Sequence, residues 1–315
     1  MADVKKIATR DSYGRALADL GAEHDDIIVF DADLSDSTRT GVFRKAFPER
    51  HFNCGIAEGN MMAVAAGAAA MGFVPFASSF VMFAACRAFE QVRNSIAYPQ
   101  LNVKIGASHG GISVGEDGAT HQCCEDIAIM RAIPDMVVMS PSDGVEAYAM
   151  VKAAYEHKGP VYMRFGRSAV PVIHDEVNYS FEIGKGEVLR AGSDVAIIAN
   201  GLMVYEALEA ARALAGTGIS ARVINIATIK PLDEELVLSA ARDCGRIVTC
   251  EEHSVIGGLG DAVCSLLSEK LPTPVRRIGI NDEFGVSGPA AALLRKYGLC
   301  ADNIVDVTKS FLERP

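Results

Sequence analysis

The stretch SHGGISVGEDGATHQ, residues 108–122, is the part of the chain from which the fold and the site are predicted most directly. It follows the strand-type run 101–105, so we expect it to be the loop that leaves the end of a buried strand. Its four glycines disfavour a regular helix or strand, and they let the backbone adopt positive φ and approach a ligand closely. Ligands of open α/β sheets bind at the carboxyl ends of strands, which makes this loop a predicted ligand site.

The same loop carries two histidines and two adjacent carboxylates, His109, His121, Glu116 and Asp117. Imidazole and carboxylate groups can transfer protons and can hydrogen-bond sugar hydroxyls. The alternative interpretation is a polar surface loop without a function, and the loop composition alone does not decide between the two. Evidence from the rest of the chain is therefore needed.

Composition excludes several classes of protein. The 315 residues are 50% hydrophobic and carry a net charge of −10, which argues against nucleic-acid binding but permits a phosphorylated substrate held by a few arginines. The eight cysteines form no CxxC pair, so no metal site is expected in this chain. No apolar run reaches the ~20 residues that span a bilayer, and we expect a cytoplasmic protein with reduced thiols and no membrane contact.

Strand-like and helix-like segments alternate along the chain, which predicts an α/β fold with mainly parallel sheets covered on both faces. We expect two doubly wound domains, residues 1–175 and 194–315, joined by a linker at 176–193. In the first, strands are expected at 27–30, 52–56, 74–76, 103–107, 136–139 and 161–165, and helices at 9–21, 57–72, 80–97 and 123–132. In the second, strands are expected at 195–199, 220–226, 246–250 and 275–280, with helices at 202–215, 233–242, 257–270 and 288–297.

Candidate site residues also lie outside the loop. Glu58 is at the predicted start of the helix 57–72, where a carboxylate is stabilised by about 0.3–1 kcal/mol, so it can be a simple first-turn acid. It can also be a half-buried acid that shares a proton with a ligand nitrogen. Phe80 and Phe83 lie one turn apart on the predicted helix 80–97 and either pack in the core or stack on a heterocycle.

Three further residues lie at the ends of predicted elements and could together bind a phosphate: Arg10, Ser37 and Arg167. Arginine would use its bidentate fork and serine its hydroxyl, although each residue alone is more typical of a solvated surface. No nucleotide-binding motif is present, because Gly258-Leu259-Gly260 is followed by Val263 where a dinucleotide motif needs glycine. His253 is expected to serve structure or an interface.

Several short motifs, taken together, resemble the transketolase family of thiamine-diphosphate enzymes. GIAE at 55–58, SFVMF at 79–83, GEDGATHQ at 115–122 and SPSD at 140–143 resemble its pyrimidine-binding domain. FGVSG at 284–288 and YGLCADNI at 297–304 resemble its C-terminal domain. The family's diphosphate-binding domain, with its Gly-Asp-Gly…Asn metal motif, is absent, so the chain resembles the small subunit of a split transketolase.

The resemblance implies a role for each matching residue toward the cofactor. Glu58 would be catalytic by hydrogen-bonding the aminopyrimidine ring nitrogen of thiamine diphosphate, and Phe83, with Phe80 beside it, would stack on that ring. Asp33 would lie near the cofactor across the subunit interface. Mg²⁺ and the diphosphate would be held by an N-terminal partner subunit, in a heterotetramer with two copies of each chain. Cys86 replaces an aromatic residue found in many relatives.

The resemblance also implies a substrate site for phosphorylated sugars. His109 and His121 would contact donor hydroxyls and assist proton transfer, and Asp117 would bind the hydroxyl next to the donor carbonyl. Arg10, Ser37 and Arg167 match the positions that hold the sugar phosphate. The implied reaction transfers a two-carbon ketol unit from a phosphorylated ketose to an aldose phosphate, with the cofactor as electron sink.

Four alternatives remain for the function, and the hardest to exclude is a sugar-specialised relative that acts on a branched or unusual phosphorylated ketose. A deoxyxylulose-phosphate synthase or the beta subunit of a 2-oxoacid dehydrogenase would use the same cofactor with a pyruvate-type donor. The two histidines, Asp117 and the phosphate-binding set argue against both, since they suit a polyol phosphate. A non-catalytic scaffold subunit would have no need to retain Glu58, His109 and His121.

Overall fold

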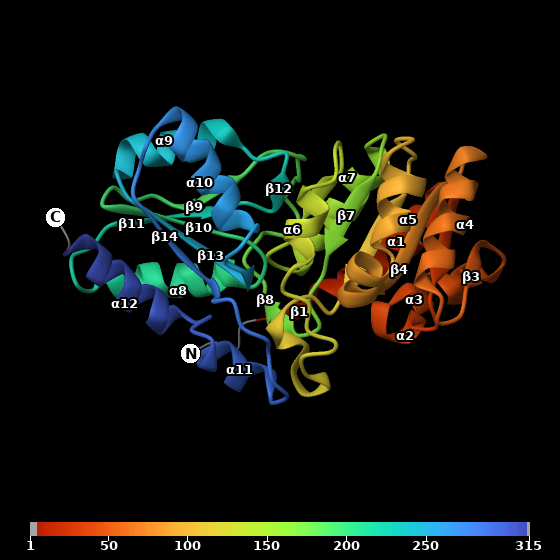
Figure 1. Ribbon diagram of the computed structural model, residues 1–315, viewed down its shortest axis with the longest axis horizontal. Helices are drawn as coiled ribbons and strands as arrows, with labels where there is room; N and C mark the ends of the chain where they lie inside the picture. Colours follow the sequence, from red (N-terminus) through yellow and green to blue (C-terminus); the bar gives the residue numbers. More distant parts are fainter. Residues whose placement is uncertain (1–4, 314–315) are drawn as a thin grey trace.

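Two mainly parallel sheets, each covered by helices on both faces, make up the chain (Figure 1). The computed structural model describes residues 5–313. The first sheet has seven strands in the order β12-β6-β7-β5-β4-β2-β3. These are β2 (Ile27–Asp31), β3 (His51–Asn53), β4 (Val74–Phe80), β5 (Lys104–Ser108), β6 (Val137–Met139), β7 (Val161–Arg164) and β12 (Thr228–Lys230). Every pairing in this sheet is parallel except that of β12 with β6.

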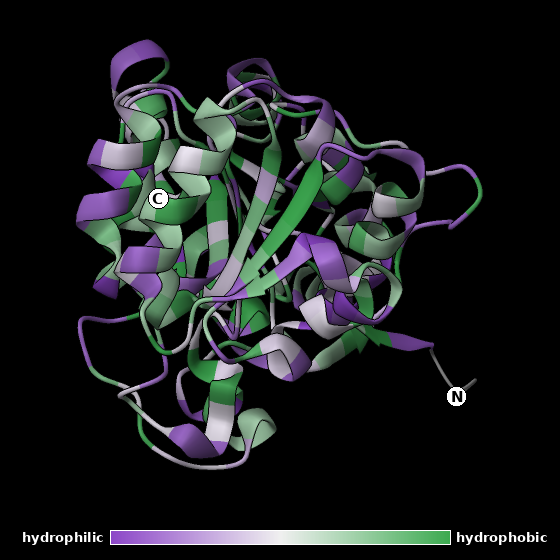
Figure 2. Ribbon diagram, turned by 90° about the vertical axis from the view of Figure 1, so that its right-hand side faces the viewer, coloured by the Kyte–Doolittle hydropathy of each residue, from purple (hydrophilic) through white to green (hydrophobic). Residues whose placement is uncertain are grey.

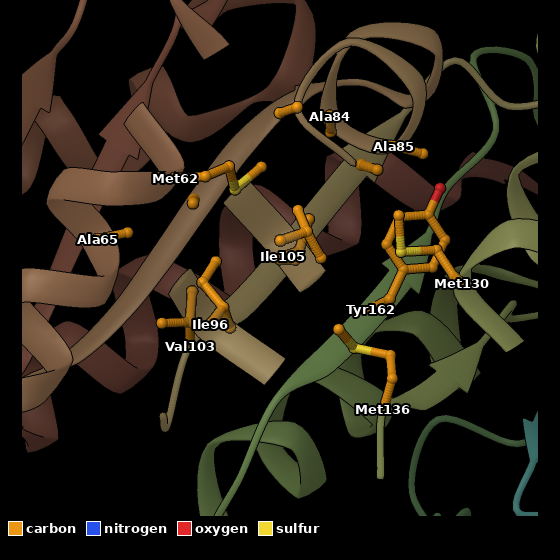
Figure 3. Close-up of a cluster of buried hydrophobic side chains, with 14 of the residues drawn as sticks. Met62, Ala65, Ala84, Ala85, Ile96, Val103, Ile105, Met130, Met136 and Tyr162 are labelled. Carbon is orange, nitrogen blue, oxygen red and sulfur yellow. The ribbon is translucent and has the colours of Figure 1, made fainter. Parts of the chain in front are cut away.

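Helices lie on both faces of the first sheet because its strands are apolar on both sides. On one face, α1 (Thr9–Glu23) and α7 (Gly144–Glu156) pack over a core that includes Tyr13, Leu17 and Met150. On the other, α4 (Glu58–Ala70), α6 (Asp126–Arg131) and the helical segment 82–97 enclose a core of Met62, Ile105 and Tyr162 (Figure 3). Short helices α2 (Ser35–Thr38) and α3 (Thr40–Ala46) follow β2.

The second sheet has five strands in the order β14-β13-β10-β11-β9. These are β9 (Glu187–Arg190), β10 (Val195–Ala199), β11 (Ala221–Asn225), β13 (Ile247–Ser254) and β14 (Val275–Ile280), and only β9 is antiparallel. α8 (Met203–Ala215) and α12 (Ala301–Leu312) cover one face, while α9 (Glu234–Cys244) and α10 (Leu259–Lys270) cover the other. The predicted α/β class with two doubly wound sheets is confirmed.

Hydrophobic residues follow the central strands, and the surrounding helices alternate hydrophobic and hydrophilic positions (Figure 2). This is the pattern of helices that bury one face against a sheet. In the described residues, no helix is both long and apolar enough to cross a membrane.

Two small pairings tie the ends of the first domain to the rest of the chain. β1 (Lys6–Ala8) pairs antiparallel with β8 (Ala169–Pro171), which brings the start of the domain to its end. β12, although it follows the second-domain strand β11, adds an edge strand to the first sheet (Figure 1). The boundaries at 175 and 193 stay predictions.

The structure corrects the prediction of a helix at 80–97. β4 extends to Phe80, which pairs with Ser108, because the run VPFASSF continues the strand beyond the predicted end at residue 76. The helical segment that follows has π geometry at Met82–Arg87 and Val92–Ala97, with α5 (Phe89–Gln91) between them. Phe80 and Phe83 are therefore not on one helix. The helices α3 and α12 were not predicted, and the strand expected at 52–56 covers 51–53 instead.

Candidate active site

Glu58 is the first residue of α4, and its side chain is only 1% exposed. One carboxylate oxygen, Oε2, accepts a hydrogen bond from Nη1 of Arg87 at 2.9 Å. The other, Oε1, accepts from Oγ of Ser79 at 3.4 Å, so both oxygens have a donor. Glu58 is thus a buried carboxylate whose charged donor, Arg87, has a half-exposed side chain.

Aromatic rings form a continuous wall next to this acid. Phe80 ends β4 and Phe83 lies in the first π segment, with ring centroids 6.0 Å apart and planes 18° apart. His109, after β5, stacks on Phe80 at 3.9 Å, and His121 presents its edge to Phe83 at 5.4 Å. The structure thus brings four predicted site residues together from three separate parts of the first domain.

His109 is buried and neutral. Burial, reinforced by the positive charges of Arg10 and Arg167, lowers the pKa of His109 to about 3. Its Nε2 lies 3.3 Å from Nη1 of Arg10, which can only donate, so Nε2 accepts and Nδ1 carries the proton toward Oγ of Ser108 at 2.9 Å. Its left-handed φ of 62° turns the ring toward Phe80 as the chain leaves the strand.

Two of the predicted phosphate-binding residues lie beside this histidine. Arg10, in the first turn of α1, also donates to the backbone oxygen of Ser37 at 2.8 Å, so Ser37 contacts the site through its main chain in this structure. Arg167 donates to Glu116 of the loop at 2.8 Å and is about one third exposed. Burial is the largest cause that lowers the pKa of Arg10 and that of His109, and the positive charge of Arg167 lowers both further.

Asp33 and Asp117 stand apart from this cluster. Asp33 is exposed, has φ of 63°, and exchanges hydrogen bonds with Asn53, whose Nδ2 donates to Oδ1 of Asp33 at 3.0 Å. Asp117 is exposed at the end of the short 3₁₀ segment Ile112–Asp117. Both carboxylates face solvent, so a contact with cofactor or substrate remains a prediction for each.

The site loop is held in place by the second domain. The backbone N–H of Ser113 donates to the buried Glu252 at 2.6 Å, and Nε2 of Gln122 donates to the backbone oxygen of Val286 at 3.0 Å. Gly118 has φ of 75°, and a Cβ there would lie 2.3 Å from Oγ of Ser287. The glycine therefore permits both the turn and the close approach of the second domain.

The structure also places His253, which was expected to serve structure or an interface, and Cys86. His253 is fully buried, and its Nε2 accepts from the backbone N–H of Ala128 at 3.3 Å, which makes it an interdomain contact. Cys86 is exposed next to the aromatic wall, and its Sγ lies 3.6 Å from Sγ of the buried Cys123.

The carboxylate of Glu58 and the ring of Phe83 fit the aminopyrimidine half of thiamine diphosphate. Arg87 donates an N–H to Glu58, and its guanidinium lies over the Phe83 ring at 4.4 Å, so the acid and the ring accept a flat, nitrogen-rich group together. A fit for the metal is not seen, since within residues 5–313 no group of three or more His, Cys, Asp or Glu side chains is arranged to hold one.

Sequence reasoning missed three residues of this site: Arg87, Glu252 and Gln122. A signal existed for Arg87, since it follows Phe83 by four positions in a helical segment and therefore lies on the same side. Nothing in the sequence connects Glu252 with the loop 139 residues away.

Family models match both domains. Residues 5–172 match the transketolase pyrimidine-binding domain, and residues 184–304 match the transketolase C-terminal domain. A Methanocaldococcus jannaschii protein named for a transketolase C-terminal section is 52% identical, and the match covers 94% of this chain and 93% of that protein. The 6-deoxy-6-sulfo-D-fructose transketolase subunit of Clostridium sp. (strain MSTE9) is 45% identical, over 97% of this chain and 94% of that one.

A solved structure described as a split gene transketolase, inactive beta4 tetramer, has a TM-score of 0.91 at 54% identity, covering 98% of this chain and 100% of that chain. Longer relatives are matched over about half of their length. They include mouse transketolase, 39% identical with 50% covered, and a Geobacter sulfurreducens 1-deoxy-D-xylulose-5-phosphate synthase, 42% identical with 47% covered.

Proposed function

This chain belongs to the transketolase family as a C-terminal subunit of the split type, and we propose that it transfers a two-carbon ketol unit between phosphorylated sugars together with a partner chain. The family depends on thiamine diphosphate, which supplies the electron sink for the two-carbon fragment. The observation that carries the proposal is the buried Glu58 beside the wall of Phe80, Phe83 and His109.

The geometry supports a separate role for each group in the cluster. Glu58, at the N-terminus of α4, holds or releases a proton at Oε2 toward a ring nitrogen of the cofactor. Phe83 offers a flat face for the ring. His109, neutral at physiological pH, orients sugar hydroxyls, and the half-buried His121 contacts the same wall through Phe83. Arg10 and Arg167 supply positive charge for a sugar phosphate.

The proposed function includes a partner chain, which is supported by a relative that is named as a transketolase subunit. We propose that the partner holds Mg²⁺ and the diphosphate and docks on the surface around α4. Five large apolar side chains are exposed there, Phe52, Ile56, Val64, Met71 and Phe73, each by at least 43%. An exposed apolar patch of this kind marks an interaction surface. The relative solved as an inactive beta4 tetramer supports the need for a second type of chain, and a heterotetramer is the proposed assembly.

The choice of sugar phosphates over pyruvate-type donors rests on Arg10, Arg167 and the two histidines. One relative is named for 6-deoxy-6-sulfo-D-fructose, so the physiological sugar pair is part of the test. A non-catalytic scaffold is the second candidate, and the satisfied but exchangeable contacts of Glu58 favour catalysis over it.

The test is to isolate the native complex of this chain and identify its partner by mass spectrometry. The complex is then assayed for ketol transfer with Mg²⁺ and thiamine diphosphate, using phosphorylated ketoses and a pyruvate donor side by side. We expect a partner with a Gly-Asp-Gly…Asn motif and turnover with the ketose phosphates. Turnover with pyruvate alone would overturn the substrate class, and a chain that purifies without partner or activity would indicate a scaffold.

A further inference from the structure

Arg87 lies where two parts of the proposed cofactor site meet. Its Nη1 donates to Oε2 of Glu58 at 2.9 Å, and its guanidinium carbon lies 4.4 Å from the centroid of the Phe83 ring. The side chain of Arg87 is 51% exposed, whereas Glu58 is 1% exposed. The guanidinium of Arg87 therefore extends from solvent into the site, where it pairs with the buried Glu58 and stacks on the ring of Phe83.

These are the two contacts that the resemblance assigns to the aminopyrimidine ring of the cofactor. A guanidinium and an aminopyrimidine are both flat, and both carry N–H donors in their molecular plane. The guanidinium has a delocalised positive charge, whereas the aminopyrimidine is a polar ring. Because Phe80 and His121 already contact Phe83, the space that remains on this ring is limited. A group that binds Glu58 and stacks on Phe83 must compete with Arg87.

We propose that Arg87 is the positioning residue of the aminopyrimidine subsite: in the free chain its guanidinium fills the subsite, and it turns out to solvent when the cofactor ring binds. This inference rests on the proposed function. It assigns to Arg87 a role in forming the site, and it leaves the chemical step to Glu58.

The surroundings of Arg87 suit a side chain that moves. Within residues 5–313 its hydrogen-bond and ion-pair partner is Glu58 alone, so turning outward breaks one ion pair and one ring contact. It ends the π segment Met82–Arg87, a geometry that is often found at functional sites.

Arg87 would thus be a placeholder for the cofactor ring. This role also explains how Glu58 can stay buried in a chain without its cofactor. A buried carboxylate without a partner is strongly destabilising, so a donor is needed before the ligand arrives. Ser79 supplies one donor at 3.4 Å, a long hydrogen bond, and Arg87 supplies the charged one. The ring nitrogen of a neutral aminopyrimidine carries no N–H, so after the exchange Glu58 is paired through a proton at its Oε2 that it donates to this nitrogen.

The first experiment measures binding of 4-amino-5-hydroxymethyl-2-methylpyrimidine to the full chain by calorimetry or ligand-detected NMR. Wild type is compared with Arg87→Ala and with Arg93→Ala, a control in the next π segment whose exposed side chain donates to Asn94. We expect Arg87→Ala to bind roughly three- to tenfold more tightly, because the competing ion pair and cation–π contact are gone. Arg93→Ala should bind as wild type does.

The second experiment needs no variant and therefore does not depend on folding of Arg87→Ala. Phenylglyoxal modifies exposed guanidinium groups, and peptide mass spectrometry gives the rate at Arg87 with and without saturating pyrimidine. We expect the rate at Arg87 to rise with pyrimidine and the rate at Arg93 to stay constant. A merely structural arginine would be unaffected by pyrimidine.

The outcomes separate the two proposals. Equal or weaker binding by Arg87→Ala, or a lower rate of modification of Arg87 with pyrimidine, would overturn the placeholder while leaving the proposed function intact. Pyrimidine binding by none of the three chains, together with no ketol transfer by the native complex, would overturn both.

Discussion

The carboxyl ends of the two sheets differ although the sheets share one architecture. In the second domain, the buried acids Glu251 and Glu252 lie in the last half of β13, and both are satisfied by backbone donors: Glu251 accepts from the N–H groups of Leu259 and Gly260 at 2.7 and 2.8 Å, and Glu252 accepts from that of Ser113. In the first domain, Glu58, Arg87 and Arg167 hold contacts that are partly exposed to solvent. The carboxyl end of the first sheet is therefore accessible to a ligand, whereas that of the second sheet holds the site loop in place.

This difference teaches that position at a strand end does not by itself make a site. A buried acid is structural where backbone N–H groups satisfy it permanently, because losing them would cost the desolvation of the charge. It is available for chemistry where a mobile side chain satisfies it. The two buried acids Glu58 and Glu251 therefore provide a matched pair for experiment.

The strongest test replaces each acid by its amide. Glu58→Gln should lower turnover of the assembled enzyme by at least about 100-fold, the size of a lost general acid–base contribution, while the complex still assembles. Glu251→Gln should leave turnover nearly unchanged and lower the free energy of unfolding by about 1–3 kcal/mol. Steady-state kinetics and chemical denaturation measure both. The contrast between the domains fails if Glu251→Gln reduces turnover as much as Glu58→Gln does.

A second test asks whether the second domain positions the loop. Gly118→Ala places a Cβ 2.3 Å from Oγ of Ser287 at φ of 75°, so it should destabilise the protein by about 1–3 kcal/mol and also reduce turnover. Gly218→Ala is the matched control, since Gly218 has φ of 85° with no atom within 4 Å. It should cost about 1 kcal/mol and leave turnover unchanged. Equal kinetics for the two variants would remove the support role of the second domain.

A third test concerns the phosphate. Arg167→Ala should raise the KM for phosphorylated acceptors roughly tenfold, since a charge-assisted contact to phosphate is lost. The internal control is an unphosphorylated aldehyde, whose KM should be unaffected. An equal rise in KM for both acceptors would show that Arg167 maintains the loop conformation through Glu116 and does not bind the phosphate.

The smallest expected effect lies between the domains. Nδ1 and Nε2 of His174 lie 3.1 Å from Asp143, the N-cap residue of α7, and 3.1 Å from Glu187 of β9. Burial alone would lower the pKa of His174, but the interaction with Asp143 and the charges of Glu146 and Glu187 outweigh it and raise that pKa. Stability from this contact is therefore complete below the unfolded value of about 6.5 and is lost as pH rises through the folded value.

Denaturation of His174→Gln against wild type measures this contribution. The difference in the free energy of unfolding should be about 1 kcal/mol at pH 6 and should shrink toward pH 8.5. His24→Gln is the control, because His24 also stacks on a tyrosine, Tyr155, at 4.4 Å but is partly exposed and lies 4.0 Å from the exposed Glu23. A difference that is constant with pH would show that the ring acts by packing on Tyr179 and not by its charge.

Much of the first domain could be predicted because its signals are local. The apolar runs that form β2, β5 and β7, and the glycine-rich loop after β5, are visible within short windows. The end of β4 at Phe80 was missed, since VPFASSF is ambiguous between strand and helix and only pairing with β5 decides it. The π segments depend on that same register and have no sequence signature that we could use.

The site was predictable as a set of residues but not as a set of contacts. His109, Phe80, Phe83 and His121 do meet, as expected for one binding wall. Their mutual orientation depends on the turn at His109 and on the second-domain contacts to the loop, which join residues far apart in sequence. The pairing of Arg87 with Glu58 is equally non-local, and propensity or periodicity does not reveal it.

β12 gives the first sheet its outer edge, and it comes from residues 228–230. During synthesis, β6 therefore emerges from the ribosome well before the strand that will cover it, and its free backbone groups can pair with a neighbouring chain in the meantime. A fragment that stops at residue 175 would keep that edge permanently open and would be prone to aggregate. A sheet that begins with residue 27 therefore has its last edge covered only once residue 230 has been synthesised.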